Sequence, residues 1–147
     1  QALHFFNKSI KINSHNSEYW KAAAHAEFKI GNTISSISAY EEASLLGPDD
    51  KEIWLNWSFI YYEQGEPQKA IEILLQGMDE LPDESEFFYR MTIYLIEYGQ
   101  FKEAMNYLEN ALILDFKGHE VLFDFFPTLE TQKALQKIID QFRKENP

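Results

Sequence analysis

The feature of this sequence that most restricts its fold is a spacing of 34 residues that recurs along the chain. Two of the three tryptophans, Trp20 and Trp54, stand 34 positions apart, and large apolar residues continue the series at Phe88 and Leu122. Further columns in the same register hold glycines (Gly31, Gly65, Gly99), small residues (Ser36, Ala70, Ala104 and Ala43, Gly77, Ala111) and large apolar residues (Tyr40, Leu74, Leu108, Phe142). Agreement of several columns at one period indicates a repeat protein.

Each 34-residue unit is predicted to form two helices joined at a glycine. The first helices are expected at 17–30, 51–64 and 85–98, after capping-type residues (Asn16 or Ser17, Asp50, Glu84 or Ser85). The glycine after each of them suits a left-handed C-terminal cap, which favours a residue without a Cβ atom. The second helices are expected at 34–46, 67–80 and 101–115, with Pro67 at a first helical position. Apolar residues recur at helical spacing and no segment alternates as a strand would, so the predicted class is all-α.

The small and large columns predict how the helices pack. Two helices are expected to approach closely where Ala70 and Ala104 stand, because a larger side chain would hold them apart. The large residues, such as Trp54 and Leu74, are expected to fill the space between one hairpin and the next. One hairpin cannot bury its apolar face alone, so stacked neighbours must supply the core. The predicted architecture is an α-solenoid of antiparallel helix hairpins with about eight to nine helices.

These columns resemble the tetratricopeptide repeat (TPR), a helix–turn–helix unit of 34 residues. The unit that matches the family pattern best carries Trp54, Trp57, Ser58, Tyr61, Ala70, Leu74, Gly77 and Pro82. The preceding unit has Glu27 where the family usually has Tyr, and the following unit lacks the closing Pro. The resemblance covers residues 17–116 and implies a TPR superhelix that binds other proteins. It names no partner, because these repeats serve many unrelated ones.

The repeat register predicts a single TPR domain over 1–147. Residues 1–16 are expected to be the second helix of a repeat whose first helix is absent, and full repeats follow at 17–50, 51–84 and 85–118. The apolar face of the first segment would lack a partner on one side, so we expect a truncation or a covering partner there. Pro127 is expected to shorten the next first helix, and an amphipathic helix at 131–144 would turn Leu135, Ile138, Ile139 and Phe142 inward. Residues 119–147 are interpreted as a divergent repeat or C-terminal cap.

Composition excludes several classes of function. The chain has 13 Lys and Arg against 24 Asp and Glu, a net charge of −11, and no cysteine. An acidic surface opposes nucleic-acid binding, which depends on Lys and Arg contacts to phosphates, and no apolar run reaches the length of a membrane span. The four histidines form no helical pair and no nucleophile, metal or cofactor motif occurs, so we expect no enzyme, no metal and no cofactor. The compartment stays open between cytoplasm and periplasm.

The family resemblance implies a binding face on the first helices, which line the concave surface of the superhelix. Its centre is apolar and aromatic, and we expect it to bind an extended peptide or a partner helix, basic or apolar in character. The candidate binding residues are Lys21, His25, Leu55, Asn56, Phe59, Tyr62, Tyr89, Arg90 and Ile93. Of these, Tyr62 and Tyr89 are expected to be exposed. The glutamates that recur at Glu18, Glu52, Glu86 and Glu120 favour the positive end of a helix dipole, and they would also select a basic partner.

Three alternatives remain open. A carboxylate clamp, as in co-chaperones of this family, is matched by Lys21, Asn56 and Arg90 but not by His25 and Glu86. The negative charge of Glu86 would repel a terminal carboxylate. A second alternative is a spacer or oligomerisation segment that self-associates through the exposed face of residues 1–12. A third is an RNA reader similar to the pentatricopeptide repeats, which the net charge of −11 opposes.

Overall fold

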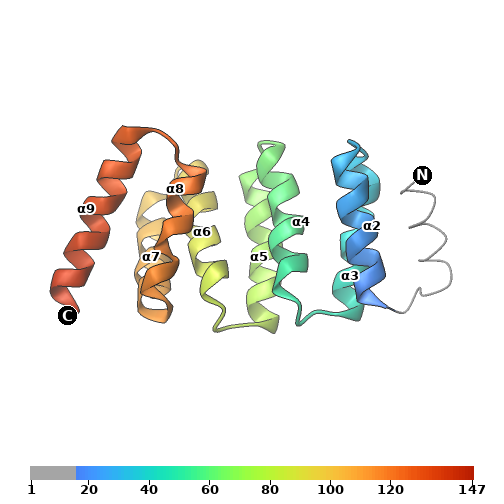
Figure 1. Cartoon of the computed structure of the whole chain (residues 1–147), viewed down its shortest axis with the longest axis horizontal. Helices are drawn as coiled ribbons and strands as arrows, with labels where there is room; N and C mark the ends of the chain where they lie inside the picture. The colour runs from blue at the N-terminus through green and yellow to red at the C-terminus, as the bar shows by residue number, and fades with distance from the viewer. Residues whose placement is uncertain (1–15) are drawn as a thin grey trace. The chain divides into compact units, whose positions relative to one another are not determined.

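The computed structural model describes residues 16–147, and the regular elements within that range are all helical (Figure 1). The elements are α2 (Ser17–Lys29), α3 (Thr33–Leu46), α4 (Lys51–Glu63), α5 (Pro67–Glu80), α6 (Ser85–Glu97), α7 (Phe101–Leu114), the 3-10 helix η1 (Phe116–Glu120), α8 (Val121–Phe125) and α9 (Leu129–Glu145). The predicted all-α class is confirmed. The helices of the three full repeats begin and end within one residue of the expected bounds. The helix expected at 1–16 lies outside the described residues apart from its last position.

The chain forms two compact units that meet between Pro82 and Asp83. The N-terminal unit, described from Asn16, holds the hairpins α2–α3 and α4–α5, which pack on each other through α3 and α4. The C-terminal unit holds the hairpin α6–α7, on which η1 and α8 pack, and it ends with α9. The division falls close to the predicted boundary between the second and third full repeats. The expectation of one continuous domain over 1–147 stays a prediction.

The starts of α2 and α4 follow the predicted capping chemistry, whereas Glu84 at the start of α6 makes no side-chain cap hydrogen bond. The side-chain oxygen of Asn16 accepts a hydrogen bond from the Glu18 amide at 2.9 Å, and Asp50 accepts one from the Glu52 amide at 3.1 Å. Each side chain satisfies an amide that has no partner inside its helix. The turn after each first helix contains a glycine at positive φ: Gly31 at 88°, Gly65 at 75° and Gly99 at 84°. A side chain is strained in that backbone conformation, which explains the glycine column.

The small columns lie where the two helices of each hairpin approach. Ser36, Ala70 and Ala104 are fully buried, as are Ala43 and Ala111. The serine is tolerated in this apolar position because its hydroxyl donates a hydrogen bond to the carbonyl oxygen of Ala24 at 2.7 Å. Close approach at these positions is therefore confirmed by burial.

The first helix of the fourth unit is broken. It consists of η1 and the five residues of α8, which ends two residues before Pro127. Because α8 stops early, α9 begins at Leu129, earlier than the expected 131. Two contacts hold α9 on this element: Gln132 Nε2 donates to the carbonyl oxygen of Phe126 at 3.0 Å, and the Phe142 ring stacks on Phe116 with centroids 6.4 Å apart.

One expectation for α9 is wrong. Leu135 and Ile139 are buried as expected, but Ile138, which was expected to point inward, is 39% exposed. The cause is the position of α9: Leu135 and Ile139 lie on its buried side, whereas Ile138 lines a groove beside α7.

Candidate peptide-binding face

The predicted binding residues fall into columns that repeat every 34 positions, and each column has its own environment. Lys21, Leu55 and Tyr89 form one such column. The Lys21 ammonium lies 2.8 Å from Asp50 Oδ2 and 3.0 Å from Glu52 Oε2, at the start of the next first helix. Burial lowers the pKa of Lys21, but the hydrogen bonds and charges of the two carboxylates outweigh that effect and raise it above its ordinary value. Lys21 thus joins one repeat to the next.

Tyr89 makes the equivalent contact in the C-terminal unit. Its hydroxyl donates to the carbonyl oxygen of Asp115 at 2.5 Å, and its ring lies against Gly118, where an added Cβ atom would come within 2.8 Å of Cε2. Only 1% of Tyr89 is exposed, so the expected exposure of this residue is wrong. Burial raises the pKa of its hydroxyl, with a further contribution from the charge of Asp115. Residues at the start of the next helical element, η1, therefore cover Tyr89.

Two more candidates are buried. Leu55, in the same column, is 5% exposed, and Ile93 is fully buried in the C-terminal unit, where α6 packs against α7, η1 and α8. A peptide could not reach either side chain without a rearrangement of the fold. The apolar centre that the sequence suggested is therefore largely part of the core.

Four of the candidates in the N-terminal unit remain accessible. His25 on α2 and Asn56 on α4 are exposed, and Phe59 and Tyr62 on α4 are half-buried. The rings of Phe59 and Tyr62 stack with centroids 6.0 Å apart and an interplanar angle of 27°. Asn56 hydrogen-bonds the Tyr40 side chain, whose pKa is nevertheless raised because burial outweighs that bond. We call His25, Asn56, Phe59 and Tyr62 the α2–α4 face.

Arg90, the last candidate, borders a separate cavity of about 230 Å³ in the C-terminal unit. Its guanidinium carbon lies 4.9 Å from the centroid of the Phe125 ring, and Nη1 donates to the Tyr94 hydroxyl at 3.3 Å. Glu86, Asp115 and Gly118 also line the cavity. The repeat register does not predict this cation–π contact, because Phe125 stands outside the 34-residue column of Arg90.

Negative charge borders the α2–α4 face. Glu18, Glu52 and Glu63 are exposed, whereas the nearby cation Lys21 is already paired with two carboxylates. Glu18 and Glu52 also lie in the first turns of α2 and α4, where their negative charges interact favourably with the positive ends of the helix dipoles. The face therefore attracts cationic groups more strongly than anionic ones.

Within residues 16–147, no group of three His, Asp or Glu side chains is placed to hold a metal ion. No helix in the same range has the length and apolar character needed to cross a membrane. Helical repeat proteins of this kind are generally non-enzymatic scaffolds, and nothing in the described residues indicates catalysis.

No family model matches the chain. Among curated proteins it is similar to the tetratricopeptide repeat-containing protein trd-1 of Caenorhabditis elegans, with 23% identity over 136 residues. That match covers 91% of this chain and 18% of the worm protein, so the chain spans a small part of that relative.

Solved structures are also similar to this chain. One crystal structure of the MamA protein matches with a TM-score of 0.69 and 21% identity, over 81% of this chain and 65% of that one. MamA from Desulfovibrio magneticus RS-1, described from residue 41 to its end, matches with a TM-score of 0.68 and 10% identity, over 99% of this chain and 85% of that one. Sequence identities at this level indicate a shared fold and nothing about function. Together with the repeat columns, they show that this chain has a helical-repeat fold, and they agree with its resemblance to the tetratricopeptide repeats.

Proposed function

We propose that the chain is a non-catalytic scaffold that binds a peptide or helix of a partner protein through its first helices, on the α2–α4 face. Repeat proteins of this type are generally protein-interaction scaffolds. The observation that carries the proposal is the stacked pair Phe59 and Tyr62 on α4, which stays half-buried, while His25 on α2 and Asn56 on α4 are exposed. Aromatic side chains in such a setting are common anchors of protein interfaces, because they bury much area at little entropic cost.

The electrostatics favour a basic partner. Glu18, Glu52 and Glu63 border the face, and the single charge of Lys21 is shared between Glu52 and Asp50, so the carboxylates remain in excess. A peptide with one apolar anchor for the aromatic pair and one Lys or Arg beside it satisfies both features. Complementary charge of this kind raises the association rate and sets partner choice more than it adds affinity.

The carboxylate clamp receives no support from the N-terminal unit. A clamp lysine must offer its ammonium to a terminal carboxylate, but Lys21 is engaged by Asp50 and Glu52. A peptide carboxylate would have to compete with two carboxylates of the protein itself, which are held there by the fold. The spacer alternative, which rests on residues 1–12, lies outside the described residues.

Peptides selected from a displayed random library test the proposal with two matched pairs of variants. Phe59→Ala on the face pairs with Leu75→Ala on α5, since both remove a partly exposed apolar side chain. Asn56→Arg pairs with Gln76→Arg, since both place a cation at an exposed amide. We expect basic, apolar-anchored peptides to bind about tenfold or more weakly to the two α4 variants and unchanged to the two α5 variants. Equal affinity for all four would contradict the proposal.

A further inference from the structure

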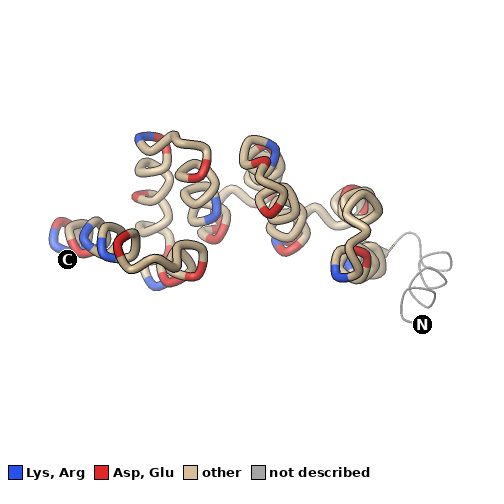
Figure 2. Tube along the Cα trace, turned by 90° about the horizontal axis from the view of Figure 1, so that it is seen from above, with Lys and Arg blue, Asp and Glu red and all other residues tan. Residues whose placement is uncertain are grey.

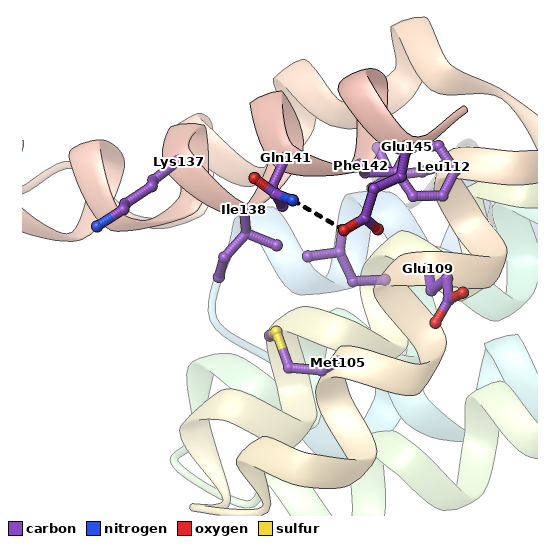
Figure 3. Close-up of a pocket in the computed structure, with 9 residues that line it drawn as sticks. Met105, Glu109, Leu112, Lys137, Ile138, Gln141, Phe142 and Glu145 are labelled. Atoms are coloured by element: carbon purple, nitrogen blue, oxygen red, sulfur yellow. Dashed lines mark hydrogen bonds between the residues drawn. The ribbon is translucent and has the colours of Figure 1, made fainter. Parts of the chain in front are cut away.

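An apolar groove lies between α7 and α9 in the C-terminal unit, on the second helix of its hairpin and away from the first-helix residues (Figure 3). It encloses about 490 Å³ and is lined by Met105, Leu108, Glu109, Leu112, Lys137, Ile138, Gln141, Phe142 and Glu145. An adjoining cavity of about 460 Å³ shares Leu112 and Phe142 with it and extends the groove to Ile113. Both volumes fall in the range of ligand sites in proteins.

The groove stays open because α9 does not pack closely on α7, and the contacts that hold it reach η1 and α8 through side chains. Gln132 fixes the start of α9 through its bonds to the carbonyl oxygens of Phe123 and Phe126. Near its end, Phe142 stacks on Phe116, and the Arg143 guanidinium lies 4.6 Å from the centroid of the same ring. The helix is therefore anchored at both ends, and Ile138 between them points across the gap toward Met105 (Figure 3).

Apolar side chains line the α7 wall along most of the helix. Leu108 and Leu112 form its buried base, Met105 is half-buried, and Ile113 in the adjoining cavity is 65% exposed. From Met105 to Ile113 the helix rises by about 12 Å, which matches about two turns of a partner helix.

The chemistry of the walls selects a helix over an extended strand. Both walls are helices, whose backbone amides and carbonyls are already bonded within the helix except at the ends. A strand laid between them would find no backbone partner, and its own polar groups would lose water in an apolar groove. A docked helix satisfies its backbone internally and presents apolar residues at helical spacing.

Charge is distributed unequally along the groove. Glu109 and Glu145 lie at one end and Lys137 at the other, as Figure 3 shows. Gln141 Nε2 donates to Glu145 Oε1 at 2.8 Å and fixes that carboxylate beside the groove. Within the described residues, neither Glu109 nor Lys137 has an ion-pair partner. Figure 2 shows both basic and acidic residues along α9. One of the basic residues, Arg143, precedes Glu145 by two positions and lines the adjoining cavity.

From this arrangement we propose that the α7–α9 groove binds an amphipathic helix of a partner protein, at least two turns long. The partner places an apolar stripe between Met105 and Ile138, and a Lys or Arg near one end of that stripe contacts Glu109 and Glu145. An acidic residue toward its other end contacts Lys137. This second interaction surface lies in the C-terminal unit and shares no residue with the α2–α4 face.

A synthetic helical peptide of 18 residues with a leucine stripe, two lysines at one end and two glutamates at the other is the probe. Its affinity is measured against the full chain and two matched variants: Ile138→Asp in the groove and Ile34→Asp on α3, both at exposed isoleucines. We expect Ile138→Asp to weaken binding about tenfold or more and Ile34→Asp to leave it unchanged. Because both side chains are exposed, thermal unfolding should show that both variants stay folded.

Reversal of charge at Glu109 and Glu145 tests the proposed contact of these residues with Lys or Arg of the partner helix. The double variant Glu109→Lys plus Glu145→Lys should prefer a peptide in which glutamates replace the two lysines, and the wild-type chain should prefer the original. The control Glu42→Lys plus Glu72→Lys makes the same change of net charge at exposed positions of α3 and α5 and should keep the wild-type preference. Equal effects of the two double variants, or equal binding by Ile138→Asp and wild type, would overturn the proposal. So would sedimentation of the wild-type chain as a dimer that Ile138→Asp dissociates, because the occupant would then be a second copy.

Discussion

At the scale of single residues, the 34-residue register predicts which side chains share a column but not what covers the column. Lys21 and Tyr89 illustrate the limit. Both stand in one column, and both contact the start of the next helical element, one through carboxylates and the other through a backbone carbonyl. The repeat register indicates only that these two residues are not used for packing between the two helices of a hairpin. Contacts between successive hairpins depend on where the next element begins, which periodicity does not encode.

The structural role of Tyr89 can be measured. Tyr89→Phe keeps the ring but leaves the carbonyl oxygen of Asp115 without this donor, so the free energy of unfolding should fall by about 1 kcal/mol. Tyr98→Phe is the matched control, because Tyr98 is 42% exposed, and it should unfold as wild type does. Urea titration followed by circular dichroism gives both values. Equal stability of the two variants would show that the Tyr89 hydroxyl contributes nothing to the fold.

The paired tryptophans of α4 offer a second test. Trp54 and Trp57 are both buried and stack with centroids 5.8 Å apart, but only Trp54 donates its indole N–H, to the carbonyl oxygen of Pro48 at 2.9 Å. The Trp57 indole N–H is buried with no acceptor among the described residues. Replacement of either residue by Phe removes a similar volume. We therefore expect Trp54→Phe to cost about 1 kcal/mol more unfolding free energy than Trp57→Phe. The reverse order in chemical denaturation would contradict the hydrogen-bond assignment.

At the scale of helices, the sequence was most informative where local chemistry decides the outcome. The caps at Asn16 and Asp50 and the glycine turns were predicted because each follows from one residue type and one backbone conformation. The path of α9 was not predictable in the same way. Its apolar stripe indicated that it packs inward, but the early end of α8 and the Phe116–Phe142 stack decide which part of the stripe is covered.

Asp50 combines two of these element-level effects. It caps α4 and pairs with Lys21, so Asp50→Ala should lower the unfolding free energy by about 1–2 kcal/mol. Asp50→Asn keeps a capping oxygen and loses only the charge. It should cost about 0.5 kcal/mol, because partly exposed ion pairs are weak. Equal losses in the two variants would mean that the cap contributes nothing.

The pKa of Lys21 fixes how this ion pair depends on pH. Because the folded-state pKa is raised, the stabilisation is fully present below the ordinary lysine pKa of 10.5 and is lost as pH rises through the folded-state pKa. The stability difference between wild type and Lys21→Met should accordingly stay constant from pH 7 to pH 9 and shrink only in strong alkali. A difference that already falls between those two values would contradict the raised pKa.

At the scale of the whole molecule, the repeat count could be read from the sequence, whereas the division into two compact units could not. The columns continue across Pro82 and Asp83 without a break, so nothing in the register separates the units. The register likewise indicates one binding face along the first helices. The structure distributes accessible candidates over the α2–α4 face and the Arg90 cavity, because η1 and α8 cover much of α6.

We expect a destabilising substitution in one compact unit to affect the local stability of that unit more than that of the other. Ala104 is fully buried in the C-terminal unit, and Ala104→Leu overfills that site at a cost of about 1–3 kcal/mol. Repeat proteins are stabilised by contacts within and between neighbouring repeats. Hydrogen exchange should therefore show faster exchange in α6 and α7 and smaller changes in α2 and α3. Asn106→Leu, at an exposed position of the same helix, is the control. Uniform acceleration over all helices would indicate a single cooperative unit.

The central claim is that the first helices of the repeats form the surface that recognises a partner peptide. Amide chemical-shift mapping by NMR, with a library-selected peptide titrated into the labelled chain, tests it most directly. The largest shifts are predicted in α2 and α4, around His25, Asn56, Phe59 and Tyr62, with small changes on the exposed side of α3 and α5. Shifts concentrated on α3 and α5, with α2 and α4 unperturbed, would contradict the claim.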